Sequence, residues 1–86
     1  MYKELLKASS KLVGLKQTER GVIKGAVVCV VVAFDAEERI RLRFAALSAR
    51  CKVRIVDGPS MRELGALCGI DVGASVVGIL KENKEC

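Results

Sequence analysis

The uninterrupted apolar run from Ala26 to Phe34 constrains the fold of this chain more than any other segment. It carries no charge, and five of its nine residues are valines. β-Branched residues without polar alternation predict a strand that is covered on both faces. The run is too short for a membrane span, because a helix needs about 20 apolar residues to cross a bilayer. We therefore expect a central strand over Ala26–Ala33, buried inside a layered domain.

Helix and strand patterns alternate on either side of this strand. Helical spacing predicts a helix over Lys3–Lys11, a basic helix that ends at Gly25, a helix with Ile40, Phe44, Leu47 and Cys51 on its buried side, and a short helix from Ser60 to Leu67. Further strands are predicted over Leu12–Leu15, Val53–Val56 and Ser75–Leu80. Asp35 is placed to cap the third helix, and Ser60 to Glu63 form a capping box at the fourth. This alternation favours an α/β fold, a three-layer α/β/α sandwich around a small mixed four-stranded sheet. Residues 1–86 then form a single domain, with residues 81–86 as a polar tail.

Positive charge is concentrated at the N-terminal end of the chain. Residues 1–25 hold six lysines and arginines against two acidic residues, whereas residues 26–86 hold nine against eight. A basic end on a nearly neutral body is the charge pattern of a phosphate-binding protein. The three aromatic residues are too few for the stacking surface of sheet-type single-strand RNA binders. Structured RNA or DNA is therefore the expected partner.

The sequence lacks the residue patterns of a catalytic or metal site. The four cysteines, at positions 29, 51, 68 and 86, include no close-spaced pair, and there is no histidine. We find no carboxylate pair, nucleophile elbow or phosphate-loop lysine. The N-terminus has no uninterrupted apolar signal segment. We therefore expect a cytoplasmic, monomeric, non-enzymatic protein with reduced thiols that uses no metal, cofactor, membrane or small-molecule substrate.

The basic helix carries its charges on one side. At about 100° per residue, one arc holds Lys16, Gln17, Arg20 and Lys24, and the opposite side holds Leu15, Thr18 and Val22. Gly14 opens this helix, and the free N–H groups of a helix N-terminus favour anions such as phosphate. The cations and the amide can hold a nucleic-acid backbone and read base edges. The same pattern also fits a solvated basic face on a surface helix.

A second unusual segment is the loop from Gly69 to Ala74, which contains two apolar side chains. Its glycines allow the backbone to turn sharply and to hold Ile70 and Val72 outward. Loop residues are usually exposed, so these two side chains either pack back into the core or face an apolar partner.

Three motifs follow one another along the chain. They are Gly-x-Lys-Gln-Thr-x-Arg at residues 14–20, a strand ending in Val-Ala-x-Asp-Ala at residues 32–36, and Leu-Gly-x-x-Cys-Gly-Ile-x-Val-Gly-Ala at residues 64–74. Together they resemble the motifs of the kink-turn-binding family of ribosomal proteins. The resemblance extends over about residues 3–80 and is specific because the motifs occur together at the correct distance. The chain is most similar to the small bacterial members, in its length and in having Lys16 and Gln17 where archaeal members carry Asn-Glu.

The resemblance implies an RNA partner of defined shape. Family members bind a duplex in which a three-nucleotide bulge precedes tandem sheared G·A pairs, so that the helix axis bends sharply. The residues implied to contact this RNA are Gly14, Leu15, Lys16, Gln17, Arg20 and Lys24 in the basic helix, and Ile70, Asp71, Val72, Gly73 and Ala74 in the loop. Lys16 and Gln17 would contact guanine edges, and the loop would cover the bulge nucleotides. The implied target is a kink-turn in ribosomal RNA or a riboswitch, with the ribosome as a further candidate partner.

Two functions from different classes fit these observations. The first is an RNA-binding module for kink-turns, which the alignment of three cations with Gln17 favours. The second is a protein-interaction module of the same fold, which would dock to the ribosome or a translation factor through Ile70, Val72 and an arginine-rich helix. The arginines of that helix, at positions 39, 41, 43 and 50, follow the acidic residues Glu37 and Glu38 and are interpreted as a solvated face without an assigned function.

Overall fold

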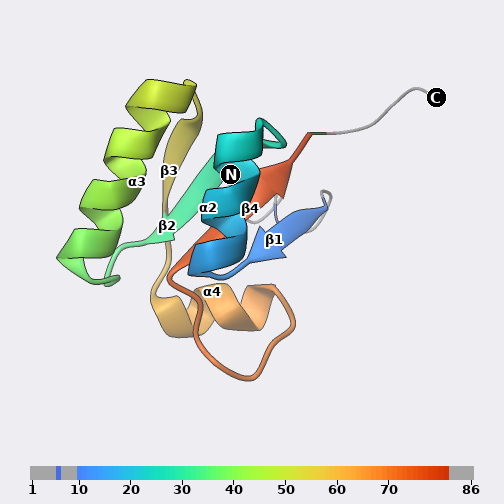
Figure 1. The fold of residues 1–86 in the computed structure, drawn as a ribbon. Coiled ribbons are helices and arrows are strands. Elements are labelled where there is room, and N and C mark those ends of the chain that lie inside the picture. The colour runs from blue at the N-terminus through green and yellow to red at the C-terminus, as the bar shows by residue number, and fades with distance from the viewer. Residues whose placement is uncertain (1–5, 7–9, 82–86) are drawn as a thin grey trace.

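The computed structural model describes residues 6 and 10–81 and has a mixed four-stranded sheet with three described helices around it (Figure 1). The strands are β1 (Lys11–Val13), β2 (Val27–Ala33), β3 (Arg54–Gly58) and β4 (Val76–Leu80). The helices are α2 (Leu15–Lys24), α3 (Glu38–Cys51) and α4 (Met61–Leu67). The strand order is β1-β4-β2-β3, with β4 antiparallel to both of its neighbours and β2 parallel to β3. The predicted α/β class and mixed four-stranded sheet are confirmed.

Strand β2 lies inside the sheet and is buried on both faces. Every residue from Cys29 to Ala33 is at most 5% exposed. Since successive side chains of a strand point to opposite faces, both faces of the sheet must be covered here, as a three-layer arrangement requires. The strand begins one residue later than predicted, at Val27. Residues Cys29 to Ala33 of the apolar run therefore form the centre of the core, whereas Val28 and Phe34 are 44% and 64% exposed.

Helix α2 packs closely on the sheet because small side chains face it. The hydroxyl of the fully buried Thr18 donates a hydrogen bond to the carbonyl oxygen of Leu12, at 3.2 Å. A Cβ atom at Gly21 would lie 2.7 Å from side-chain atoms of both Leu12 and Val27, so only glycine allows this approach. In Figure 1, α2 lies in front of the sheet and α3 runs beside it, while α4 lies past the end of the sheet at which β4 begins.

The start of α2 differs from the prediction. The strand predicted over Leu12–Leu15 is shorter, because β1 ends at Val13 and Leu15 is already helical. Gly14 has φ 111°, a left-handed value that ends the strand. Lys11, predicted as the end of the first helix, belongs to β1; Leu6 is helical and buried, and the other residues of that predicted helix except Ser10 lie outside the described residues.

The capping predictions have different outcomes. Ser60 caps α4 as predicted, since its hydroxyl accepts a hydrogen bond from the backbone N–H of Glu63 at 3.1 Å. Asp35 does not cap α3, whose N-cap is Glu37. Its carboxylate instead accepts from the backbone N–H of Met61, at 2.8 Å, and so supports the start of α4 from across the fold.

The last turn of α3 also differs from the helical pattern. Phe44 and Leu47 are buried as predicted, but Cys51 is exposed. Cys51 ends the helix and is followed by Lys52 in the left-handed conformation, with φ 59°. The strand predicted over Val53–Val56 begins at Arg54 and extends to Gly58.

Candidate nucleic-acid interface

The exposed face of α2 carries the residues that the helical spacing places together. These are Lys16, Gln17, Arg20 and Lys24, and all four are exposed to solvent. The opposite side of the helix holds the buried residues Thr18, Gly21 and Val22. The predicted packed side and basic side of this helix are therefore confirmed, and the exposed side also carries one apolar side chain, Ile23, which is 63% exposed. Three cations and one amide face solvent along a helix of ten residues.

The N-terminus of α2 leaves backbone donors available for an anion. The first bond within the helix runs from the N–H of Thr18 to the carbonyl oxygen of Gly14, at 3.1 Å. Within the described part of the chain, no side chain caps this end. The N–H groups of Leu15 to Gln17 precede that first bond, and in this position they favour a negative charge. The other end is closed by Gly25, as predicted, in the left-handed conformation with φ 82°.

The loop between α4 and β4 presents one apolar side chain to solvent rather than two. Val72 is 70% exposed. Ile70 is half-buried and packs against the core, so the expectation that both side chains point outward is wrong for this residue. Ala74 is buried as well, whereas Asp71 and Gly73 are exposed. Gly69 allows the sharp turn at the start of the loop, with φ 79°.

Backbone contacts with α4 fix the position of this loop. The carbonyl oxygen of Val72 lies directly against Gly65, where any Cβ atom would overlap it. A Cβ atom at Gly73 would lie 3.2 Å from the carbonyl oxygen of Met61, which also accepts the backbone N–H of Ala74 at 3.0 Å. The loop is therefore held against α4 by the backbone of Val72 and by Gly73 and Ala74, which follow it. The sequence motif contains both glycines, but it does not indicate that they allow the loop to pack against α4.

The loop and the start of α2 meet at one end of the sheet. The N–H of Gly14 donates to the carbonyl oxygen of Val76, at 3.2 Å, and the N–H of Ala33 donates to that of Ser75, at 2.8 Å. Both acceptors directly follow the loop in the chain. The N-terminus of α2 and the loop are thus joined through β4 (Figure 1).

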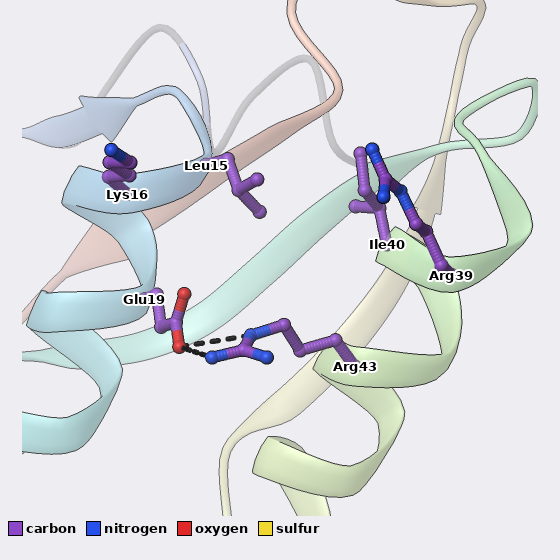
Figure 2. Close-up of a pocket in the computed structure, with 6 residues that line it drawn as sticks. All are labelled: Leu15, Lys16, Glu19, Arg39, Ile40 and Arg43. Atoms are coloured by element: carbon purple, nitrogen blue, oxygen red, sulfur yellow. Dashed lines mark hydrogen bonds and ion pairs between the residues drawn. The ribbon is translucent and has the colours of Figure 1, made fainter.

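An ion pair between α2 and α3 is a feature that the sequence interpretation missed. The guanidinium of Arg43 binds the carboxylate of Glu19, with an Nε–Oε2 distance of 3.0 Å and a second contact from Nη2 (Figure 2). The hydrogen bonds and the negative charge of Glu19 raise the pKa of Arg43. Arg43, interpreted as part of a solvated face without function, therefore reaches the helix that carries the candidate interface. The two residues are 24 positions apart, so no local pattern indicates the pair.

Within residues 6 and 10–81, no group of three or more His, Cys, Asp or Glu side chains gathers as a metal site would, and no helix is long and apolar enough to cross a membrane. Cys29 is buried in β2, as the predicted central strand requires, and Cys68 lies at the end of α4. Burial raises the pKa of both thiols, so they are less reactive as nucleophiles at neutral pH. Cys86 lies outside the described residues.

Comparison with known proteins assigns the chain to a family. The model of the ribosomal protein L7Ae/L30e/S12e/Gadd45 family matches residues 2–86. The chain belongs to this family.

Three bacterial members of the L7Ae/L30e family are similar over nearly their whole length, and all three are RNA-binding proteins. The protein of Halalkalibacterium halodurans is 36% identical over 80 residues, which cover 93% of this chain and 98% of that protein. YbxF of Geobacillus stearothermophilus has the same identity and coverage. The protein of Geobacillus sp. strain WCH70 is 40% identical over 82 residues, again covering 93% and 98%.

Two solved structures share the fold of this chain. A Bacillus halodurans protein of unknown function superimposes with a TM-score of 0.81 at 19% identity, over 92% of this chain and 79% of that chain. The 15.5kD RNA binding protein of Giardia lamblia superimposes with a TM-score of 0.80 at 24% identity, over 94% and 68%. At these identities the likeness concerns the fold alone.

Proposed function

We propose that this protein binds structured RNA and recognises kink-turns, in which a bulge is followed by tandem sheared G·A pairs. One arrangement carries the proposal. The exposed face of α2 holds three cations and Gln17, the N-terminus of the same helix has no side-chain cap, and β4 joins that end to the loop that contains Val72. Membership in the L7Ae/L30e family and the RNA-binding relatives support it. The shape of the RNA matters because an ordinary A-form major groove is too deep and narrow for side chains to read.

The proposed roles follow from what each group can donate or accept. Lys16 has donors only, so its base contact would be with O6 or N7 of a guanine. Gln17 can both donate and accept at a base edge. Arg20 can bind a guanine or a phosphate in bidentate fashion, and Lys24 a phosphate. Gly14 and Leu15 would allow the RNA to approach the backbone of the helix start.

The loop would cover the unstacked nucleotides of the bulge. Val72 offers the exposed apolar side chain for this contact, with Asp71 and Gly73 beside it. Ile70 and Ala74 would act through the position of the backbone, because their side chains pack inward. We infer that the RNA is ribosomal RNA or a riboswitch and that the protein works in the cytoplasm as a non-catalytic monomer. Crosslinking in cells, followed by sequencing of the bound RNA, identifies the target.

A comparison of two RNA duplexes tests the proposal. One contains a kink-turn, and the other is a straight duplex of the same length and base composition. We expect the protein to bind the kink-turn much more tightly in a gel-shift assay, with an affinity that falls as salt rises because phosphates are neutralised. Equal affinity for both duplexes would leave only non-specific electrostatic binding and would refute recognition of the kink-turn.

The alternative, a protein-interaction module, has less support. It requires Ile70 and Val72 to form an apolar contact surface together, and Ile70 is half-buried against the core. A protein partner also gives no reason for Lys16, Arg20 and Lys24 to lie on one face with Gln17. We therefore favour RNA over protein as the partner of this surface.

A further inference from the structure

A groove lies between α2 and α3, beside the candidate RNA-binding face. It has a volume of about 380 Å³ and is lined by Leu15, Lys16, Glu19, Arg39, Ile40 and Arg43 (Figure 2). Leu15 and Ile40 are half-buried and pack against the core. Lys16 comes from α2 and Arg39 from α3, so a cation stands on each side of the groove. A second hollow of about 400 Å³ shares Arg39 and Arg43 and continues along α3 to Arg50.

Charge is divided unevenly between the two sides of α3. The side that lines these two hollows carries Arg39, Arg43 and Arg50. The other side of α3, toward β3, carries Arg41 and Glu38, which line a separate hollow together with Asp57 of β3. The side of α3 that continues the basic face of α2 is therefore the positive one. This division favours a polyanion as the ligand of the groove.

The two arginines of the groove have different surroundings. Arg43 is paired with Glu19, whose side chain is only 20% exposed. The guanidinium of Arg43 neutralises this carboxylate, which would otherwise repel a phosphate beside Lys16. Arg39 pairs with Glu37, at 2.9 Å, but the two side chains are 85% and 63% exposed. An ion pair this exposed is weak and can be exchanged for a phosphate. Arg39 and Lys16 are thus the cations available to a ligand.

We propose that the α2–α3 groove binds the phosphate backbone of the same RNA, beyond the contacts made by the exposed face of α2; this inference rests on the proposed function. Arg39 is the phosphate ligand. Arg43 is a positioning residue that neutralises Glu19 and ties α3 to α2. The groove shares Lys16 with the α2 face, so a strand leaving that face passes directly onto Arg39.

Two arginine variants on one helix test the role of Arg39. Arg39→Ala removes the proposed phosphate ligand, and Arg41→Ala removes the same charge from the opposite side of α3. RNA affinity is measured for both, and for the unmodified protein, on the kink-turn duplex between about 50 and 200 mM salt. Loss of one phosphate contact makes the slope of log K against log salt less steep by about 0.9. We therefore expect the loss of affinity caused by Arg39→Ala to be about 3.5-fold smaller at 200 mM salt than at 50 mM salt. Arg41→Ala should keep the slope of the unmodified protein.

A second set of variants tests the role of Arg43. Arg43→Ala should weaken RNA binding, and Arg43→Ala combined with Glu19→Gln should restore most of the lost affinity, because the repelling carboxylate is gone. Melting temperatures confirm that all variants are folded. If Arg39→Ala and Arg41→Ala have the same affinity and slope, or if Glu19→Gln gives no rescue, the groove does not bind RNA in this way. The preference of the unmodified protein for the kink-turn over the straight duplex would stand in that case, so the proposed function is tested separately.

Discussion

Gln17 and Lys24 share the exposed face of α2 but can make different contacts with RNA. An amide can read the donor and acceptor pattern of a base edge, whereas an ammonium group acts as a point charge for phosphate. We expect Gln17→Ala to reduce the preference for the kink-turn by about 1–3 kcal/mol, the value of one good base contact. Lys24→Ala should instead weaken binding to kinked and straight duplexes alike and lower the salt slope by about 1.

Titrations of both variants against both duplexes, at several salt concentrations, separate the two roles. The melting temperatures should not change by more than about 4 °C, because both side chains are exposed and substitutions at such positions rarely alter stability by more than about 0.5 kcal/mol. Identical binding profiles for the two variants would show that base and phosphate contacts are not divided along α2 as proposed.

At the scale of elements, the packing of the loop on α4 is the feature on which the position of Val72 depends. Gly65 lies where a Cβ atom would overlap the carbonyl oxygen of Val72. Gly65→Ala gains up to about 1 kcal/mol of helix propensity, but it must displace the loop backbone, and overpacking of this kind costs about 1–3 kcal/mol. We expect the cost to exceed the gain, with a lower melting temperature and weaker RNA binding.

Val72→Asp is the matched variant for this prediction. Val72 is 70% exposed, so a carboxylate there should leave the melting temperature nearly unchanged while weakening RNA binding through lost apolar contact and repulsion of phosphates. Calorimetry measures the melting temperature of both variants and gel-shift assays measure their RNA affinity, so that loss of loop packing is distinguished from loss of RNA contact. A large fall in the melting temperature of Val72→Asp, or none in Gly65→Ala, would contradict the packing described here.

The sequence predicted correctly the features that depend on residues close together in the chain. It did not predict the contacts that depend on residues far apart in the chain. The valine run, the two sides of α2, and the caps at Gly25 and Ser60 all follow from residues close in sequence. Asp35 is adjacent to α3 in sequence, but its hydrogen bond is to Met61, 26 residues away. The inward packing of Ile70 likewise depends on where α4 lies. Sequence spacing contains no information on such contacts until the fold is known.

On the scale of the whole molecule, the candidate site is an assembly of segments that are far apart in the chain. The motifs at residues 14–20 and 64–74 indicate its two main parts, and the hydrogen bond from Gly14 to Val76 links the first to the strand that follows the second. The ion pair between α3 and α2 was missed because the charges of a surface helix look the same in sequence whether or not a neighbouring helix contacts them. Helical spacing places Arg39 and Arg43 on one side of α3 and Arg41 on the other, but only the structure shows that the side with Arg39 and Arg43 faces α2.

The protonation state of the whole chain leads to a final prediction. The chain contains no histidine, and Lys, Arg, Asp and Glu side chains ordinarily change charge outside the range of about pH 5.5 to 7. The raised pKa values of Cys29 and Cys68 keep these thiols neutral in that range, and the raised pKa of Arg43 keeps its charge. Because histidine is the side chain that ordinarily titrates in this range and the sequence has none, we expect RNA affinity at constant salt to be nearly flat from about pH 5.5 to 7. Gln17→His is the positive control, because an imidazole on the exposed face of α2 titrates near pH 6.5 and should strengthen phosphate binding as the pH falls. A pH-dependent affinity of the unmodified protein, measured on an RNA whose own fold is constant over this range, would show that a titrating group outside this description takes part in binding.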